Sequence, residues 1–434
     1  MKNVRFLVFA FLLLPFALSS CGGGSSSGGG ISGTTQLTGT VYAPNGSDPI
    51  AGATVYVPSG SASISVKAPS GKSAIGKTAT TCDAAPETSC AEGCSGSDGT
   101  FTLNVSSCAS SDTSLKAKKG SLTLTMTIAC TTADCAIPAA DTKFPSSGAD
   151  IPQMAVVTGS YDDIQDVLAK LGYGTPDGNG QLTLGTEQFT LFDGNDSLDS
   201  PYHDFSEVLD GTIAIGTYDI VFINCGADGG DTLTTAQKTV LRDFVTAGGK
   251  LYVTDLSYDF IEQVFPEFLM FEDDPSDPLT PGSVGAADLG TAGLIVSATV
   301  NNAVMAEWLA EVTVIANGSG GPGNPEDDCS AGTYTTRTSA LDSSGYIPID
   351  DFLGGWAEIE GKHTGSGALD PTLWILDAAA GTTGLANRPL TASVAFGTNG
   401  GKIAYSSYHT AHSCPTIHFW PQERVLEYLI FETF

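Results

Sequence analysis

The stretch from residue 248 to 261, GGKLYVTDLSYDFI, constrains the fold more than any other part of the chain. An apolar run at 251–253 follows a Gly-Gly turn, which is typical of a buried parallel strand. The chain then turns at 254–257, and a helix is predicted from 258 to 261. A strand that turns sharply into a helix holds one side chain at the carboxyl edge of a sheet, where open α/β folds place their chemistry. The residue at that position is Asp255.

Strand and helix patterns alternate on both sides of this elbow. Short apolar runs predict strands at 154–157, 189–192, 218–224, 373–376, 390–396 and 403–408. Helical spacing appears at 164–171, 236–245 and, as a closing amphipathic helix, at 422–431. The alternation predicts βαβ crossovers and therefore an α/β parallel-sheet domain over residues 153–434.

Residues 35–137 have a different period. Alternating segments at 37–42, 53–57, 101–105 and 122–128 are separated by turn residues such as Asp98-Gly99, without a helical pattern. This part is predicted to be a β-sandwich. The Pro/Ser/Ala composition of residues 138–152 predicts a linker, so the chain as a whole is expected to be multidomain.

The first 34 residues are predicted to contain an export signal and a tether. Lys2 and Arg5 precede the apolar run 6–18, and Leu-Ser-Ser-Cys follows. Residues 1–20 are therefore predicted to be a signal peptide, too short to span a bilayer comfortably. The exit resembles a bacterial lipobox, which implies that Cys21 is lipidated and that Gly/Ser-rich residues 21–34 tether the chain to the outer membrane. The alternative is an ordinary secreted protein with a stray thiol.

Export implies an oxidising compartment and hence disulfides. Six cysteines, at 82, 90, 94, 108, 130 and 135, predict three bridges in the first domain, with Cys130 and Cys135 as a local pair. Cys82, Cys90, Cys94 and Cys108 then allow three connectivities. A zinc site formed by these four is the rival, which export and irregular spacing disfavour. In the second domain we pair Cys329 with Cys414, which leaves Cys225 as the odd thiol.

The net charge of the chain argues against polyanionic partners. The chain has 48 acidic and 18 basic residues, a net charge of −30, so nucleic acid and anionic lipid surfaces are repelled. Acidic runs at 272–277 and 326–328 are candidate calcium loops, but neither has EF-hand spacing, and solvated loops are the default prediction.

Three segments of the first domain resemble a known module. The pattern G-x-V at 39–41, PIAGATVYV at 49–57 and SDGTFTL at 97–103 resembles the carboxypeptidase regulatory-like domain, a transthyretin-like sandwich. The resemblance implies a stalk, adhesion or binding unit without catalytic residues.

The second domain resembles the class I glutamine amidotransferase-like superfamily, which is flavodoxin-like and includes the trehalose-utilisation-type proteins. The shared features are a strand ending in NCGADGG, a helix ending in Gly-Gly, the strand-elbow-helix, and a late strand ending in YSSYHTA. The family implies an elbow Cys, a His after the late strand and a Glu two residues later. These positions hold Asp255, His409 and Ala411. The resemblance therefore implies a degenerate site at Cys225, Gly226, Asp255 and His409, without amidotransferase or cysteine-peptidase chemistry.

Two readings of Cys225 and of the histidines stay open. Cys225 is either a buried structural thiol or a displaced nucleophile. His409, His412 and His418 with Asp255 are a candidate site for zinc or calcium, against the alternative of polar surface histidines, and no cofactor is expected by default.

We expect a non-catalytic binding or scaffolding protein at the cell surface, with a ligand site at the degenerate sheet edge around Cys225, Asp255 and His409. Its partner is a glycan or a protein, and its membrane contact is only through the lipid on Cys21. The alternative is an extracellular hydrolase acting on glycan or peptide with His409 and Asp255, with or without a metal. An open cleft in which Asp255 and His409 converge would favour the hydrolase.

Overall fold

The computed structural model describes residues 33–60, 82–128, 130, 132–230, 232–271, 287, 289–290, 296–317, 334–349, 352, 355–364, 367–378, 387–411 and 416–433. Cys21, Cys329, His412 and Cys414 lie outside the described residues, as do both acidic runs. No helix in the described part of the chain is long and apolar enough to cross a membrane.

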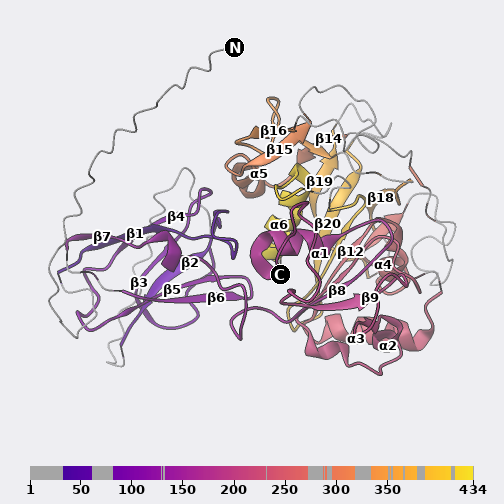
Figure 1. Cartoon of the computed structure of the whole chain (residues 1–434), viewed down its shortest axis with the longest axis horizontal. Coiled ribbons are helices and arrows are strands. Elements are labelled where there is room, and N and C mark those ends of the chain that lie inside the picture. The colour runs from indigo at the N-terminus through magenta and orange to yellow at the C-terminus, as the bar shows by residue number, and fades with distance from the viewer. Residues whose placement is uncertain are drawn as a thin grey trace, which may run out of the picture.

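Seven short strands form two sheets in the N-terminal part, at the left of Figure 1. The three-stranded sheet has the order β4-β1-β7, with β1 Gln36–Thr40, β4 Thr100–Asn104 and β7 Asp134–Ala136. The four-stranded sheet has the order β3-β2-β5-β6, with β2 Thr54–Pro58, β3 Ser89–Cys94, β5 Ser114–Lys119 and β6 Leu122–Thr127. Phe101 and Leu103 are buried and alternate with threonines along β4, as a strand with one core-facing side requires.

Three disulfides hold these strands together. Cys82 pairs with Cys94, and Cys90 pairs with Cys108, which is one of the three connectivities open from the sequence. Cys130 pairs with Cys135. Because their sulfurs are joined in these bridges, the cysteines of the first domain are not available as zinc ligands.

The segment predicted to be a linker packs against the first domain. Phe144 is fully buried, and its backbone N–H donates to the carbonyl of Tyr42. Lys143 forms a parallel bridge with the same residue, and Thr142 is also buried. The composition predicted a linker, and the apolar side chain of Phe144 is buried in the core, which fixes this segment against the first domain.

A ten-stranded sheet organises the second part, in the order β10-β9-β8-β11-β12-β21-β20-β19-β14-β17. Its strands are β8 Met154–Val157, β9 Thr190–Asp193, β10 His203–Asp204, β11 Ile220–Ile223, β12 Lys250–Thr254, β14 Val296–Val300, β17 Ile347–Ile349, β19 Thr372–Asp377, β20 Pro389–Phe396 and β21 Gly401–Ser406. Two further antiparallel pairs are β13 Leu269–Phe271 with β18 Ile359–Lys362 and β15 Val314–Asn317 with β16 Tyr334–Arg337.

The sheet is mixed, which corrects the prediction of a parallel sheet. Strands β10 to β21 of the order above pair in parallel, whereas β21, β20, β19, β14 and β17 pair antiparallel. β20 and β21 are joined by residues 397–400, in which Gly397 and Gly400 have positive φ values of 68° and 83°. A connection this short makes a hairpin and cannot make the crossover that parallel strands need.

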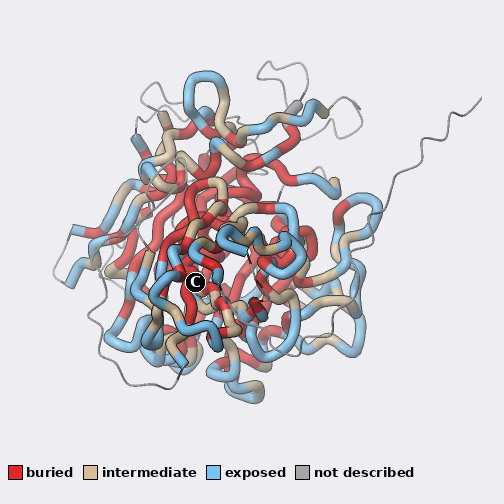
Figure 2. The backbone as a smooth tube through the Cα atoms, turned by 90° about the vertical axis from the view of Figure 1, so that its left-hand side faces the viewer, coloured by how far each residue is buried: buried red, intermediate tan, exposed pale blue. Residues whose placement is uncertain are grey.

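Helices cover both faces of the sheet. One hydrophobic cluster joins one face to α1 Ile164–Leu168, α5 Ala303–Leu309 and α6 Pro421–Thr433. The other joins the opposite face to α2 Ser206–Leu209, α3 Thr235–Thr246 and α4 Asp259–Glu262. Figure 2 shows the buried backbone concentrated in the interior, with exposed segments at the periphery.

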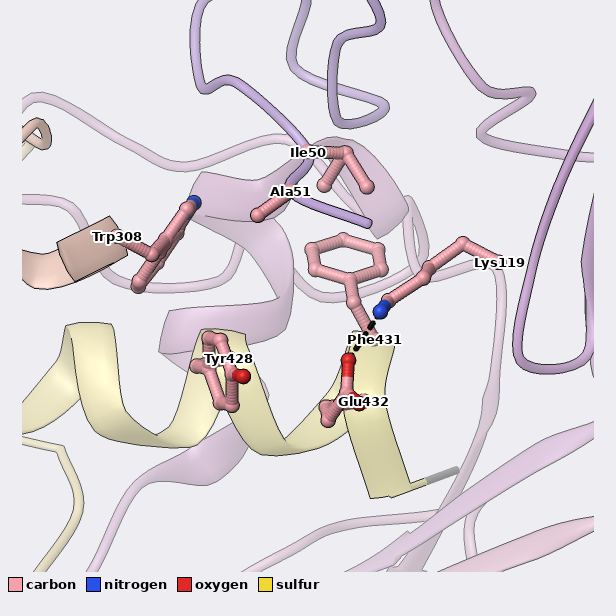
Figure 3. A pocket seen from close by; sticks show the side chains of 7 residues that line it. All are labelled: Ile50, Ala51, Lys119, Trp308, Tyr428, Phe431 and Glu432. Carbon is pink, nitrogen blue, oxygen red and sulfur yellow. Dashed lines mark hydrogen bonds and ion pairs between the residues drawn. The ribbon is translucent and has the colours of Figure 1, made fainter. Parts of the chain in front are cut away.

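Helix α6 lies between the two parts of the chain (Figure 1) and is buried on every side. The amphipathic pattern predicted one buried face, yet all residues from 422 to 431 are buried. The reason is that the first domain covers the second face. Figure 3 shows Ile50 and Ala51 facing Phe431, and an ion pair joins Lys119 to Glu432. The cavity left at this contact is only about 10 Å3, so the two parts are closely packed.

Candidate functional site

Three neighbouring parallel strands end at one edge of the sheet, and each is followed by one residue of the predicted site. Cys225 follows β11, Asp255 follows β12, and His409 follows β21. His409 Nε2 lies 3.0 Å from Asp255 Oδ2, and Cys225 Sγ lies 3.6 Å from the same oxygen. The structure therefore brings together the three side chains that the sequence placed at this edge.

Asp255 occupies a strained elbow. Its φ is +43°, in the left-handed region that non-glycine residues rarely adopt, although aspartate tolerates it better than most. The backbone N–H of Ala357 donates to Asp255 Oδ1 at 2.9 Å, and the hydroxyl of Tyr405 donates to the Asp255 carbonyl at 2.9 Å. These two contacts fix the carboxylate so that Oδ2 faces Cys225 and His409.

Without a bound metal, burial favours the neutral form of the Cys225 thiol. Its backbone N–H donates to Thr254 Oγ1 at 2.9 Å, and its sulfur accepts from the backbone N–H of Leu256 at 3.4 Å. Burial, followed by the neighbouring Asp255 carboxylate, raises the pKa of the thiol to about 12. Because a thiolate is the reactive form, this arrangement does not suit a nucleophilic cysteine.

The cluster is closed to solvent. The side chains of Asp255 and His409 are fully buried, and Cys225 is buried with them. Burial also raises the pKa of Asp255. The ring of Tyr161 stacks on His409 at a centroid distance of 6.4 Å and an interplanar angle of 6°, while Tyr161 itself is 54% exposed. Tyr161 is therefore part of the cover, and Asp255 and His409 converge without forming an open cleft.

The loop after β8 seals the same edge, and a glycine makes this possible. A Cβ added to Gly159 would lie 2.1 Å from the Cys225 carbonyl oxygen. A Cβ on Gly226, whose φ is +78°, would lie 2.7 Å from the Tyr161 ring. The contact lies at the topological switch point between β8 and β11, where open α/β sheets bind ligands.

Asp162 is a site residue that the sequence reasoning missed. It is buried, and it accepts hydrogen bonds from the backbone N–H groups of Thr410 at 3.1 Å and Ala411 at 2.9 Å. Burial raises the pKa of Asp162, and the neighbouring His409 opposes the rise. Ala411 stands where the resemblance implied an orienting Glu, but the carboxylate of Asp162, from the loop after β8, lies close to His409. Its place in the loop after the first strand of the sheet domain was the signal in the sequence.

An open cavity of about 280 Å3 lies beside the sealed cluster and shares Gly159 with it. Its walls come from β9, from the start of α1 and from the loops around them, and they include Thr158, Asp163, Gln165, Asp166, Gln181 and Leu184. Burial raises the pKa of Asp166 to about 7. None of these residues was singled out as a binding residue from the sequence, since they lie on separate segments and no local pattern reveals that they share a cavity.

The expected histidine site is only partly present. His418 is exposed, and its backbone carbonyl accepts from Lys170 Nζ at 3.2 Å. The potential metal-ligand atoms that lie within 4.8 Å of one another at this edge belong to Cys225, Asp255 and His409, so Cys225 takes the place that the prediction gave to His418.

No protein-family model matches the chain, and no curated protein matches it. Several solved structures are similar at low identity. A cytoplasmic protein from Salmonella typhimurium is 11% identical, with a TM-score of 0.32 over 65% of this chain and 100% of the other. Thua-like proteins from Bacteroides uniformis and Parabacteroides merdae are each 10% identical, with TM-scores of 0.33 and 0.28. They cover 66% and 63% of this chain and 93% and 87% of their own.

Proposed function

We propose that this chain is a cell-envelope lipoprotein that acts as a non-catalytic binding or scaffolding protein at the cell surface. The lipid on Cys21 anchors it to the outer membrane, and the carboxypeptidase regulatory-like sandwich and the flavodoxin-like, amidotransferase-like domain project from the membrane. The export signal, the lipobox and the acidic composition of the chain support this proposal.

The observation on which the non-catalytic part rests is the burial of the sheet edge. Cys225, Asp255 and His409 have no contact with solvent. A substrate outside the protein cannot reach a nucleophile or base at this position.

Because the sheet edge expected to hold the ligand is buried, the ligand site of this proposal is the open cavity beside it. Its walls combine carboxylates, side-chain amides and leucines, a mixture that can hydrogen-bond hydroxyl groups and pack against an apolar sugar face. A surface glycan is therefore the first partner to test, followed by protein segments.

Binding of the purified chain to a glycan array tests the proposal, with two matched glutamine variants. Gln181→Ala removes an amide from the cavity wall and should weaken binding about fivefold, the effect of one hydrogen bond. Gln153→Ala removes an exposed amide elsewhere and should bind like the parent. Equal loss in both variants, or no binding to glycans or protein segments, would overturn the cavity assignment. A precursor whose size does not respond to globomycin would overturn the lipoprotein assignment.

A hydrolase is the second candidate, favoured by the 3.0 Å contact between His409 Nε2 and Asp255 Oδ2. In this alternative the pair would act on glycan or peptide once the cover moves aside. Release of product from either substrate class that disappears in His409→Ala, but persists in His418→Ala, would replace the binding proposal with this one.

A further inference from the structure

The cluster at the sheet edge has the composition of a metal site. Its three donor types are a thiol, an imidazole and a carboxylate, which are the ligands that zinc takes in proteins. They come from the loops after β11, β12 and β21, and all three are buried.

The positions of the donors separate a metal site from a catalytic triad. In a triad the imidazole lies between the nucleophile and the acid and contacts each through a different nitrogen. Here Cys225 Sγ and Asp255 Oδ2 are themselves 3.6 Å apart, so they lie on the same side of His409. The three donor atoms thus surround one point, all within 4.8 Å of one another.

The distances agree with tetrahedral zinc. Zinc bonds of about 2.3 Å to sulfur and about 2.1 Å to oxygen or nitrogen place sulfur and oxygen roughly 3.6 Å apart, and nitrogen and oxygen roughly 3.4 Å apart. The observed separations are 3.6 Å between Cys225 Sγ and Asp255 Oδ2 and 3.0 Å between His409 Nε2 and the same oxygen. The first separation fits as it stands, and the second needs to open by a few tenths of an ångström.

The groups around the donors are those that orient metal ligands. The Ala357 N–H occupies Asp255 Oδ1 and leaves Oδ2 for the central point. The Leu256 N–H donates to the Cys225 sulfur, as backbone amides do to bound thiolates. The Asp162 carboxylate lies close enough to His409 to interact with it electrostatically, and it holds the His409 loop through the backbone N–H groups of Thr410 and Ala411.

Charge also balances with a divalent ion. One zinc ion, one thiolate and one carboxylate sum to zero, which reduces the cost of burying these groups. We propose that Cys225, Asp255 and His409 bind one zinc ion that ties together the three loops at the carboxyl edge of the sheet. The fourth coordination position belongs to a further ligand, and the site is independent of the ligand that occupies the neighbouring cavity.

The test uses the purified full chain, equilibrated with zinc and then dialysed, with metal measured by elemental analysis. The expected result is one zinc per chain in the parent. The zinc content should be about tenfold lower, or lower still, in His409→Ala and Asp255→Asn. His418→Ala changes an exposed histidine and should keep the zinc content of the parent. No bound zinc in the parent, or full retention in His409→Ala, would overturn the proposal.

Cobalt substitution gives a readout that requires no destabilising variant. Cobalt bound to a thiolate produces a charge-transfer band in the near ultraviolet, which cobalt held by surface carboxylates lacks. The parent should show this band, and the conservative variant Cys225→Ser should lose it. A cobalt-loaded parent without the band would show that Cys225 is not a ligand and would contradict the site. Failure of glycan binding in the cavity would leave both results unchanged, so the two proposals are tested separately.

Discussion

At the scale of single residues, the sheet edge holds several groups in forms that cost free energy. Asp255 adopts a left-handed conformation, a strain of roughly 1–2 kcal/mol for an L-residue. Its carboxylate, that of Asp162 and the Cys225 thiol are all buried with pKa values raised by burial. Backbone strain and buried ionisable groups of this kind are concentrated at binding and catalytic sites. Both the proposed zinc site and the proposed ligand cavity therefore lie at or beside this edge of the sheet.

The cover over Cys225 leads to a prediction about thiol reactivity. In chain freed of metal by a chelator, the raised pKa and the burial should make Cys225 react with a thiol-specific dye on the order of 1,000-fold more slowly than in the denatured chain. Subtraction of the rate for Cys225→Ser isolates this thiol from the others.

Tyr161→Ala should raise the rate at which Cys225 of the folded chain reacts with the dye about tenfold or more, because it removes the ring that stacks beside His409. Tyr346→Ala, a change of another exposed tyrosine, should leave the rate unchanged. A native rate equal to the denatured rate in the parent would show that the cover is not closed in solution.

At the scale of elements, α6 is unusual because its charged residues are buried along with its apolar ones. Arg424 lies between Glu427 and Asp48, and Lys170 pairs with Glu423 at 2.6 Å. Burial, opposed by Arg424 and helped by Asp48, raises the pKa of Glu427 to about 8. These groups are buried because the first domain lies over the helix.

The raised pKa of Glu427 makes stability depend on pH. The unfolded chain releases this proton near pH 4.5, whereas the folded chain keeps it until about pH 8. The stabilisation that protonated Glu427 contributes to the folded chain is therefore complete below about pH 4.5, and it is lost as the pH rises through 8. Urea midpoints at about pH 5 and about pH 9 should fall for the parent and fall less for Glu427→Gln.

The control for this prediction is Glu360→Gln, which alters an exposed carboxylate on β18. Its urea midpoint should fall between about pH 5 and about pH 9 as much as that of the parent. Part of this fall comes from Asp166, whose raised pKa also makes the folded chain less stable as the pH rises. An identical decline in Glu427→Gln and in the parent would mean that Glu427 is not protonated in the folded chain.

At the scale of the whole molecule, the first domain and the sheet domain share one interface. Asp48 Oδ2 lies 2.7 Å from Arg424 Nη1, and Trp308 Nε1 donates to the Pro49 carbonyl at 2.8 Å. Side chains of both parts belong to one continuous hydrophobic cluster. The first domain is therefore packed directly against the sheet domain.

The buried ion pair across this interface should matter far more than an exposed one. Asp48→Ala leaves Arg424 with one carboxylate fewer and should lower the free energy of unfolding by about 3 kcal/mol, measured by urea denaturation. Asp370→Ala removes the partner of Lys362 in an exposed pair and should leave the free energy of unfolding essentially unchanged. Equal effects would indicate that the two domains do not stay docked in solution.

The local patterns in the sequence predicted much of the fold. The strand predicted at 251–253 and the elbow at Asp255 depend on neighbours in the chain, and the structure confirms them, with the strand extending over 250–254. The edge position of Cys225 and His409 follows from the ends of parallel strands, so this too could be predicted. The Gly397–Gly400 turn was a readable sign of a hairpin, and the parallel-sheet prediction missed it.

What the sequence by itself determined is therefore local: periodicity, caps, turns and the residue at each strand end. The tertiary structure alone decided the closure by Tyr161, the approach of Asp162 to His409, the neighbouring cavity and the burial of α6. Each of these depends on side chains that are distant in the chain and that meet only after the sheet and the first domain have packed together. One sequence has no periodic signal for such contacts, because their energy comes from burial and electrostatics between separate elements.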